Sequence, residues 1–467
     1  MTTPVRPEKQ LHPWREGVAP RPAATILLLR DTSTGPQVLL TRRSPTASFG
    51  PGAHVFPGGA LDDRDASPRA LELAHARDDQ DAEILAYATA AAREAFEELG
   101  ILLARGRGDA ASIAALARRL DRGPDADLFE QIAANQLRLA LDEIHWLSRW
   151  ITDHDLPKRF DARFFVARMP ERQEPVADES EQFEPVWVTP AEGLAGHADG
   201  RFEMMFPTVY TLRKLRGFGS VDEIIDHART QPAVKVRLSR GGWRRGEIAR
   251  FVEEDLPFGE LELVAPDGGL HHCVDWQSDS AVPLLRHVHR LTAPNPGRMT
   301  GPGTNTYLVG GPGDWLVIDP GPDDPAHVDR IAALVGDGLK TIVCTHAHPD
   351  HAPGARPLQQ RTGARIVGRP SGPHFNPAWT FRPDEALDDG DRLRVGDSTL
   401  RVLHTPGHAA HHVCLLLEED GLLFSGDHIL CGSTTVVDPP DGDMRAYVAP
   451  LERLAAEPFE FIRPAHG

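Results

Sequence analysis

The chain has 467 residues, more than one ordinary hydrophobic core organises, so two or three domains are expected. Apolar content of 40% supports packed cores, and no run of eighteen or more apolar residues predicts a membrane span. The net charge is −18: residues 1–280 carry 34 basic and 45 acidic side chains, and residues 281–467 carry 16 and 23. Two acidic halves argue against broad nucleic-acid binding, which depends on basic surfaces.

The N-terminal segment and the cysteines indicate the compartment. Residues 1–22 carry charges and prolines where a signal peptide needs an apolar core, so they are predicted to form a disordered lead. The four cysteines include no CxxC pair, which argues against a zinc knuckle or a disulfide framework. Reduced, mostly buried thiols and a cytoplasmic location are therefore expected.

Residues 23–218 alternate short apolar runs with a long helix. "ATILLLRD" and "QVLLTRR", joined by "TSTGP", predict a β-hairpin, and "ARFFVARM" and "EPVWVTP" predict further strands. "DAEILAYATAAAREAFEEL" predicts a helix that ends at Gly100, and "PTVYTLRKLRGF" predicts a closing helix. Residues 219–285 carry shorter strand-like runs and are interpreted as a connector with some structure of its own.

The long helix places three glutamates on one face. Glu94, Glu97 and Glu98 stand at positions i, i+3 and i+4, and Arg93 precedes them. Like charges at this spacing cost roughly 0.2–0.5 kcal/mol per pair. A hard cation such as Mg²⁺ would neutralise them because it prefers carboxylate oxygens. Glutamate-rich helices are more often solvated surfaces, so the spacing alone identifies no site.

The stretch "REAFEELGI" resembles the second half of the Nudix box, and "VFPGG" supplies Gly58 and Gly59 upstream of it. Gly58 precedes Arg93 by 35 positions, a longer interval than the box has, and such an insertion resembles the Nudix group that acts on coenzyme A derivatives. The resemblance implies a Nudix α/β/α sandwich over residues 23–218. It also implies Mg²⁺ or Mn²⁺ held by the three glutamates, with Glu97 and Glu98 catalytic in hydrolysis of a diphosphate linkage.

Two acidic positions of that resemblance stay open. The early glutamate of the box has no match in register, and the sequence does not choose among Asp62, Asp63 and Glu83 as its substitute. Glu181 is the candidate for a later acidic residue that completes the site. The interrupted box keeps a second interpretation open, in which this half is a non-catalytic metabolite-binding module that regulates the other half.

From about Arg286 the chain alternates strand-like and helical runs, which predicts an α/β layer fold. Within it, "CTHAHPDH" follows the strand-like run "TIVCT" and places His346, His348, Asp350 and His351 in six positions. Imidazole and carboxylate groups on a loop after a strand are ligands that zinc and similar metals accept. The sequence therefore predicts one part of a metal site here.

Three further candidates each end an apolar run downstream. They are His408 in "VLHTPGH", Asp427 in "LLFSGD" and His466 in "FIRPAH". Seven ligands suffice for two metals with an aspartate between them and room for a water, an arrangement suited to hydrolysis of an ester or phosphoester. A single HxHxDH pattern occurs by chance, but four motifs that each follow a strand-like run favour the metal site.

The motifs "THAHPDH", "TPGH", "SGD" and "PAHG", in this order, resemble the metallo-β-lactamase superfamily over residues 286–467. The resemblance implies an αββα sandwich and two Zn²⁺, Mn²⁺ or Fe²⁺ ions. His346, His348 and His408 would hold one ion, and the second would have the ligands Asp350, His351 and His466. Asp427 would bridge the ions, and Asp350 would orient the attacking water.

The bridging aspartate and two departures refine this resemblance. Asp427, with "GTNTYLV" and the stretch after "SGD", resembles the glyoxalase-II-like branch, which includes a β-lactamase-like endoribonuclease, and points away from β-lactam hydrolysis. His411 stands where the family usually has a small or acidic residue. Whether His411, His412 and His428 orient the metal ligands or contact the substrate stays open. The chain stops one residue after His466, so it is expected to be truncated relative to the family.

Together these features predict a two-domain α/β metal-dependent hydrolase. The C-terminal site would cleave a thioester, ester or phosphodiester, and the Nudix-like half a diphosphate linkage. A small-molecule substrate such as a coenzyme A thioester or a nucleoside diphosphate derivative would unite the two sites, a link that rests on analogy. The alternative is an endoribonuclease on the C-terminal site, which the net charge of −7 on that segment disfavours.

Overall fold

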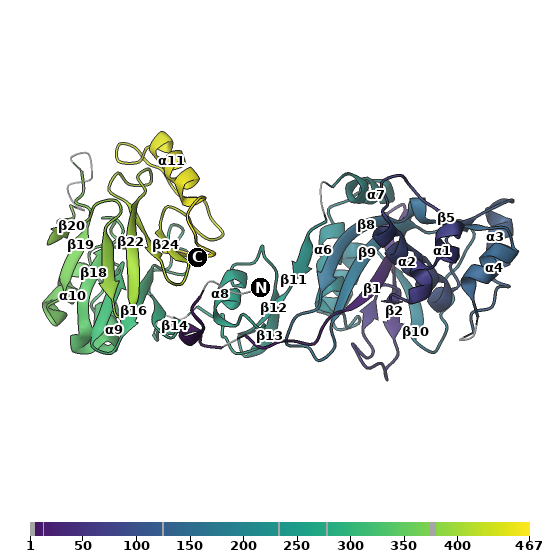
Figure 1. The fold of residues 1–467 in the computed structure, drawn as a ribbon, viewed down its shortest axis with the longest axis horizontal. Helices are drawn as coiled ribbons and strands as arrows, with labels where there is room; N and C mark the ends of the chain where they lie inside the picture. Colours follow the sequence, from purple (N-terminus) through teal and green to yellow (C-terminus); the bar gives the residue numbers. More distant parts are fainter. Residues whose placement is uncertain (1–4, 13, 124–125, 232–233, 277–278, 373–379) are drawn as a thin grey trace. The chain divides into compact units, whose positions relative to one another are not determined.

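The computed structural model describes residues 5–12, 14–123, 126–231, 234–276, 279–372 and 380–467. The chain divides into two compact units (Figure 1). The N-terminal unit comprises Val18–Ser239, and the C-terminal unit joins Met1–Gly17 to Arg240–Gly467. In the described part of the chain, no helix has the length and apolar character needed to cross a membrane.

The N-terminal unit contains a mixed sheet in the order β10-β2-β1-β9-β8-β11, with β3 paired to β2 and β4 to β1. The expected hairpin is present, since β1 (Arg21–Thr32) pairs antiparallel with β2 (Gly35–Arg43). On its other side β1 pairs in parallel with β9 (Phe160–Arg168). The remaining strands are β3 (His54–Val55), β4 (Gly58–Ala60), β8 (His145–Ile151), β10 (Gln182–Val188) and β11 (Val236–Leu238).

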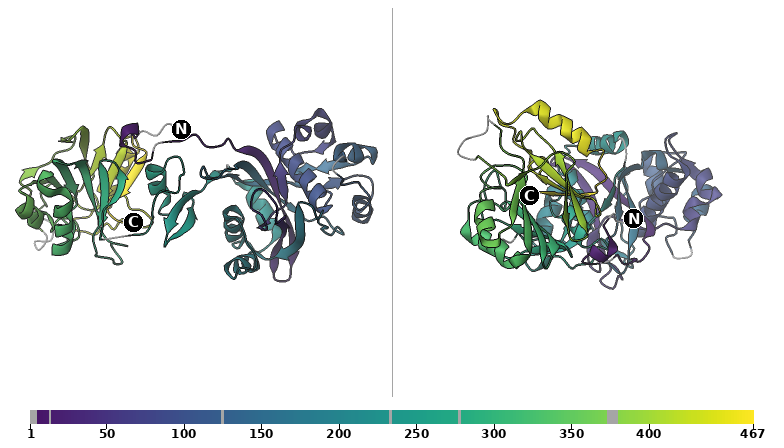
Figure 2. Two further views of the ribbon diagram at one scale, coloured as in Figure 1. Left: turned by 90° about the horizontal axis from the view of Figure 1, so that it is seen from below. Right: turned by 60° about the vertical axis from the view of Figure 1, so that its left-hand side comes forward.

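Helix α2 (Ala82–Leu99) is the predicted alanine-rich helix, and it packs against β1 through Ile26 and Leu28. Leu27 and Leu29 point to the other face, because successive residues of a strand alternate. Helices on both faces of this sheet are visible in Figure 2. The other helices with a place on the sheet are α5 (Pro190–Ala198), α6 (Phe206–Leu215) and α7 (Val221–Thr230).

The segments on either side of α2 form a small lobe of their own. It has a three-stranded sheet in the order β5-β7-β6 and short helices. These elements are η2 (Asp63–Ala66), α1 (Pro68–Leu73), β5 (Ala74–His75), β6 (Ala104–Arg105), α3 (Ala110–Ala117), α4 (Leu128–Ala134), β7 (Arg138–Ala140) and η3 (Leu141–Glu143). The inserted residues between Gly58 and Arg93 therefore fold as η2, α1 and β5.

The C-terminal unit has two facing sheets, of seven strands in the order β14 to β20 and of five strands in the order β21 to β25. The seven strands are β14 (Val282–Leu285), β15 (Val288–Thr292), β16 (Asn305–Gly311), β17 (Asp314–Ile318), β18 (Leu339–Cys344), β19 (Arg365–Gly368) and β20 (Glu385–Ala386). The five are β21 (Arg392–Val395), β22 (Ser398–His404), β23 (Val413–Leu417), β24 (Leu422–Gly426) and β25 (Phe461–Pro464).

Apolar side chains fill the spaces between these layers and fix their order. Val309, Ile318 and Val343 of one sheet share a buried cluster with Leu415 and Phe424 of the other. A second cluster joins the opposite face of the seven-stranded sheet to α9 (Pro325–Val335) and α10 (Ala355–Thr362). A third joins the five-stranded sheet to α11 (Met444–Leu454). The unit is thus an αββα sandwich, as expected.

The start of the chain differs from the disordered lead expected for residues 1–22. Val5 lies in the inter-sheet core of the C-terminal unit, and η1 (Pro7–Lys9) follows it. The guanidinium of Arg6 donates to Asp420 Oδ2 at 2.7 Å, and the Asp420 side chain is fully buried. A buried carboxylate needs such a partner, and a sequence pattern cannot reveal one 414 residues away.

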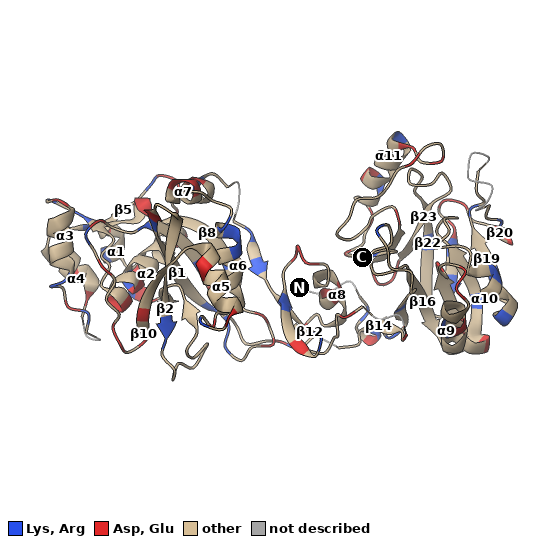
Figure 3. Cartoon of the chain, turned by 180° about the vertical axis from the view of Figure 1, so that it is seen from behind, with Lys and Arg blue, Asp and Glu red and all other residues tan. Residues whose placement is uncertain are grey.

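The expected connector, residues 219–285, also divides between the two units. Helix α7 and strand β11 belong to the N-terminal unit. The rest of the segment in the C-terminal unit forms the hairpin of β12 (Arg240–Arg244) and β13 (Glu247–Phe251), helix α8 (Phe258–Val264) and β14. Acidic and basic residues are interspersed along the elements of each unit (Figure 3).

Candidate functional site

Four segments bring the seven predicted ligands to one edge of the sandwich. Each follows the carboxyl end of a strand: the loop from His346 to His351 follows β18, His408 follows β22, Asp427 follows β24 and His466 follows β25. Potential ligand atoms form three overlapping groups in which all atoms lie within 4.8 Å of one another. All seven predicted residues belong to at least one of these groups.

Three imidazoles form the first group. His346 Nε2 lies 2.9 Å from His348 Nδ1 and 3.3 Å from His408 Nε2. His408 Nε2 lies 2.9 Å from His348 Nδ1. Burial and the neighbouring histidines lower the pKa of His348 to about 3, and the same causes hold the pKa of His346 well below its usual value. His346 and His348 are therefore neutral, which is the form in which imidazole binds a metal.

The second group contains two imidazoles and a carboxylate. Asp350 Oδ2 lies 3.1 Å from His466 Nε2 and 3.3 Å from His351 Nε2. Burial alone would lower the pKa of both histidines, but the carboxylates around them raise the pKa of His466 to about 9 and that of His351 well above its usual value. The histidines act on the carboxylate in turn, because they hold the pKa of Asp350 below its usual range despite its burial.

Asp427 lies between the two groups. Its Oδ2 is 3.5 Å from both His408 Nε2 and His351 Nε2, and 4.0 Å from His346 Nε2. Its Oδ1 is 3.4 Å from His466 Nε2. Among the described residues, neither Asp427 Oδ1 nor His351 Nε2 has a hydrogen bond although both atoms are buried. Buried lone pairs that converge without pairing fit divalent metal ions, and the N and O donors suit zinc or a similar metal.

Asp319 holds the ligand loop in place through three contacts. Its carboxylate accepts hydrogen bonds from Thr345 N at 2.7 Å and Thr345 Oγ1 at 2.8 Å, and its Oδ2 lies 3.0 Å from His351 Nδ1. The backbone of Asp319 has a φ of +49°, a strained value for a residue with a side chain. Contacts of this kind fix the ring orientation of a ligand. The signal in the sequence is an acid directly after the strand-like run "DWLVI".

Two of the histidines that follow the predicted ligands, His411 and His412, hold the backbone of the same loops. His411 Nε2 accepts a hydrogen bond from Ala347 N at 2.9 Å, and His412 Nε2 accepts one from Asp427 N at 3.1 Å. His428 is buried against the ring of Tyr447, with centroids 4.7 Å apart. None of these three histidines belongs to the groups of potential ligands among the described residues.

Two of the three glutamates of α2 pair with Arg93. Its guanidinium donates to Glu94 Oε1 and Glu97 Oε2, both at 2.8 Å. Glu98 points to the other side, where it accepts hydrogen bonds from Gly58 N at 3.0 Å and Gln182 Nε2 at 2.8 Å. Among the described residues, none of the groups of closely spaced potential metal ligands includes these glutamates. Burial raises the pKa of Glu94 to about 7 and that of Glu98 to about 8.

Arg93 also pairs with Asp65, an acid that was not among the substitutes considered for the early glutamate of the box. Asp65 is fully buried, and it accepts two hydrogen bonds from the Arg93 guanidinium, at 2.8 and 3.0 Å. Asp62 instead caps η2, and Glu83 pairs with Arg163. Among the described residues, Asp63 forms no ion pair with Arg93. Glu181, the candidate for the later acid, is exposed. The insertion hides Asp65 from a search by spacing.

Comparison with known proteins supports the C-terminal domain. Residues 299–466 match the Metallo-beta-lactamase superfamily. The atrochrysone carboxyl ACP thioesterase of Aspergillus chevalieri is 36% identical over 202 residues, which are 40% of this chain and 61% of the relative. Another atrochrysone carboxyl ACP thioesterase, from a Cryptosporiopsis species, is 33% identical over 38% of this chain and 54% of its own length. The chain thus spans little more than half the length of these curated relatives.

Among solved structures, a NUDIX hydrolase from Alicyclobacillus acidocaldarius is similar to part of the chain. It is 28% identical, with a TM-score of 0.39, and the match covers 44% of this chain and 96% of that protein.

Proposed function

We propose that the C-terminal unit is a dinuclear metallohydrolase that cleaves a thioester. In this proposal one ion has the ligands His346, His348 and His408, and the other has Asp350, His351 and His466. Asp427 contacts both sets. The observation that carries the proposal is the convergence of seven N and O donors, from four loops, with buried atoms of His351 and Asp427 left without hydrogen bonds among the described residues.

Two divalent ions at such a centre would polarise the acyl carbonyl and make water a stronger nucleophile. The chain's own contribution is orientation. Asp350 Oδ2 lies 3.4 Å from Thr304 Oγ1, and its side chain keeps 23% of its surface exposed, so it can hold the attacking water and accept its proton. Water adds to the acyl carbon, the carbon–sulfur bond breaks, and the leaving thiolate takes a proton. The products are a carboxylic acid and a thiol.

A thioester is preferred to other substrates for two reasons. Two relatives of the chain are named atrochrysone carboxyl ACP thioesterases. The acidic charge of the chain disfavours RNA, the substrate of the alternative endoribonuclease. Coenzyme A and carrier-protein thioesters share the same reacting group, and both belong in the assay.

The test is metal analysis of the purified chain followed by a substrate panel. The panel contains acyl-coenzyme A, an acyl-pantetheine, a nitrophenyl ester, a bis-nitrophenyl phosphodiester and an RNA oligonucleotide. We expect two ions per chain and hydrolysis of the thioesters well above the other substrates. Preferential cleavage of RNA or the phosphodiester would replace this proposal with the nuclease alternative.

We further propose that the N-terminal unit binds Mg²⁺ or Mn²⁺ at Glu94, Glu97 and Glu98 and hydrolyses a diphosphate linkage. The supporting observation is Glu98, a carboxyl group that is 4% exposed and whose hydrogen-bond donors among the described residues are neutral. A cation beside it would offset the cost of ionising it. Magnesium-dependent release of a phosphoester from coenzyme A, a nucleoside diphosphate sugar or a dinucleotide is the test. If none is cleaved, the interpretation as a binding module is favoured.

A further inference from the structure

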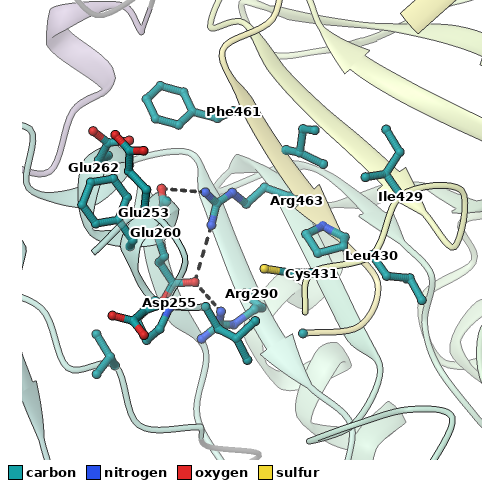
Figure 4. Close-up of a pocket in the computed structure, with 18 of the residues that line it drawn as sticks. Glu253, Asp255, Glu260, Glu262, Arg290, Ile429, Leu430, Cys431, Phe461 and Arg463 are labelled. Atoms are coloured by element: carbon teal, nitrogen blue, oxygen red, sulfur yellow. Dashed lines mark hydrogen bonds and ion pairs between the residues drawn. The ribbon is translucent and has the colours of Figure 1, made fainter. Parts of the chain in front are cut away.

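A cavity of about 500 Å³ lies in the C-terminal unit, lined by α8, β25 and the segments beside them (Figure 4). Its buried part contains Arg290 of β15, Arg463 of β25 and Glu260 of α8, each less than 9% exposed. A volume of this size holds a small organic molecule. None of these three residues belongs to the candidate metal centre.

The buried charges in the cavity are unequal. Arg290 Nη1 donates a hydrogen bond to Glu260 Oε2, and Arg463 Nη1 lies 3.6 Å from the same oxygen. Arg463 Nη2 donates to Gly259 O at 2.8 Å, and Glu260 Oε1 lies 2.8 Å from His272 Nε2. One carboxylate therefore serves two permanent cations. A buried charge without a counter-charge is costly, so the network lacks one anion.

Unused donors in the same network give independent evidence. Arg290 Nε and Arg463 Nε are buried, and neither has a hydrogen-bond partner among the described residues. Burial also lowers the pKa of Arg463, against the raising effect of Glu260. Buried N–H groups in folded proteins are normally paired. An anion beside the two guanidinium groups would supply the missing negative charge.

The rest of the lining restricts which anion fits. Phe258, Trp276 and Phe461 supply apolar and aromatic walls. Four further acids also line the cavity: Glu253, Asp255 and Glu460 are exposed and Glu262 is half-buried, so salt screens their charges over about 8 Å. The buried guanidinium groups are screened much less, so they attract one nearby negative charge. The exposed carboxylates repel a molecule that carries several negative charges.

We propose that this cavity is a binding site for a small monocarboxylic acid with an apolar or aromatic body, its carboxylate held by Arg290 and Arg463. The acid would complete the buried charge network with Glu260. Its site is linked to the candidate metal centre by sequence, because Arg463 precedes His466 by three residues at the end of β25. The proposal does not depend on the thioesterase activity, since it concerns binding alone.

The test is calorimetric titration of the full chain with four matched probes. They are 3-phenylpropionate, its neutral amide, the corresponding amine and phenylphosphonate at a pH where it is a dianion. We expect the carboxylate to bind at least tenfold more tightly than each of the others. Equal binding of acid and amide, stronger binding of the amine or the dianion, or no binding of the acid at millimolar concentration would each overturn the proposal.

The matched variants are R463M and R392M. R463M leaves Glu260 and Arg290 as a balanced pair, so the unit is expected to fold, and carboxylate binding should fall at least tenfold. R392M removes an arginine whose side chain is 57% exposed, and it should bind as the unmodified chain does. If R463M loses its folded circular dichroism spectrum, R290M, which leaves Glu260 paired with Arg463, answers the same question. Unchanged affinity in the folded variant contradicts the proposal.

Discussion

Replacement of Asp427 by asparagine tests the candidate metal centre at its middle. The carboxylate has four imidazole nitrogens within 3.4–4.0 Å, and only 11% of its side-chain surface is exposed. D427N keeps the size of the side chain and removes its charge. At an effective dielectric constant of about 20, two unit charges about 4 Å apart interact by about 4 kcal/mol. A divalent ion makes this a lower bound, so affinity for at least one metal should fall by about a thousandfold or more.

The assay for D427N is metal content after dialysis, with hydrolysis of an acyl-coenzyme A thioester measured in parallel. We expect fewer than two ions per chain and loss of most activity. The control is D443N, because Asp443 caps α11 by accepting a hydrogen bond from Ala446 N, and asparagine caps equally well. D443N should match the unmodified chain. If D427N kept two tightly held ions and full activity, the bridging role of Asp427 would be wrong.

Four further substitutions test other parts of the account. D319N should weaken metal binding more than it lowers the melting temperature, because it removes the negative charge beside His351 Nδ1; equal metal affinity in a titration would refute the bracing role. Glu97→Gln and Glu98→Gln should each abolish magnesium-dependent phosphoester release and leave thioester hydrolysis unchanged, as two parallel assays would report. Burial lowers the pKa of His327 to about 4 in the folded chain, against about 6.5 when unfolded. The unfolded state therefore binds the proton first as the pH falls from 6.5 to 4, and stability declines by up to about 3 kcal/mol. H327Q should flatten that decline in urea unfolding, and an unchanged pH profile would show that this histidine does not cause it.

The residues that meet at the metal centre could be found from the sequence because each follows a strand. Cys344, Gly426 and Pro464 end apolar runs, and the ligands come directly after them or within a short loop. Local patterns thus predicted an α/β layer fold and the candidate ligands from His346 to His466, whereas the αββα order was implied by the resemblance to the metallo-β-lactamase superfamily.

Partners chosen by three-dimensional packing could not be found in this way. Asp65 pairs with Arg93 across an insertion that breaks the spacing of the motif, and it was not considered alongside Asp62, Asp63 and Glu83. Arg6 reaches Asp420 across almost the whole chain, and its surroundings resembled a disordered lead. The network of Glu260, Arg290 and Arg463 has the same origin, since three distant elements meet there.

The central claim is most directly tested by titrating metal-free chain with Zn²⁺, and separately with Mn²⁺ or Fe²⁺, while thioester hydrolysis is followed. The account predicts that activity rises until two equivalents are bound and that it is absent without metal. The variants H408A and H466A should each retain one tightly bound ion per chain. Thioester hydrolysis by the metal-free chain, or saturation of both metal binding and activity at a single equivalent, would contradict a dinuclear centre built from these seven residues.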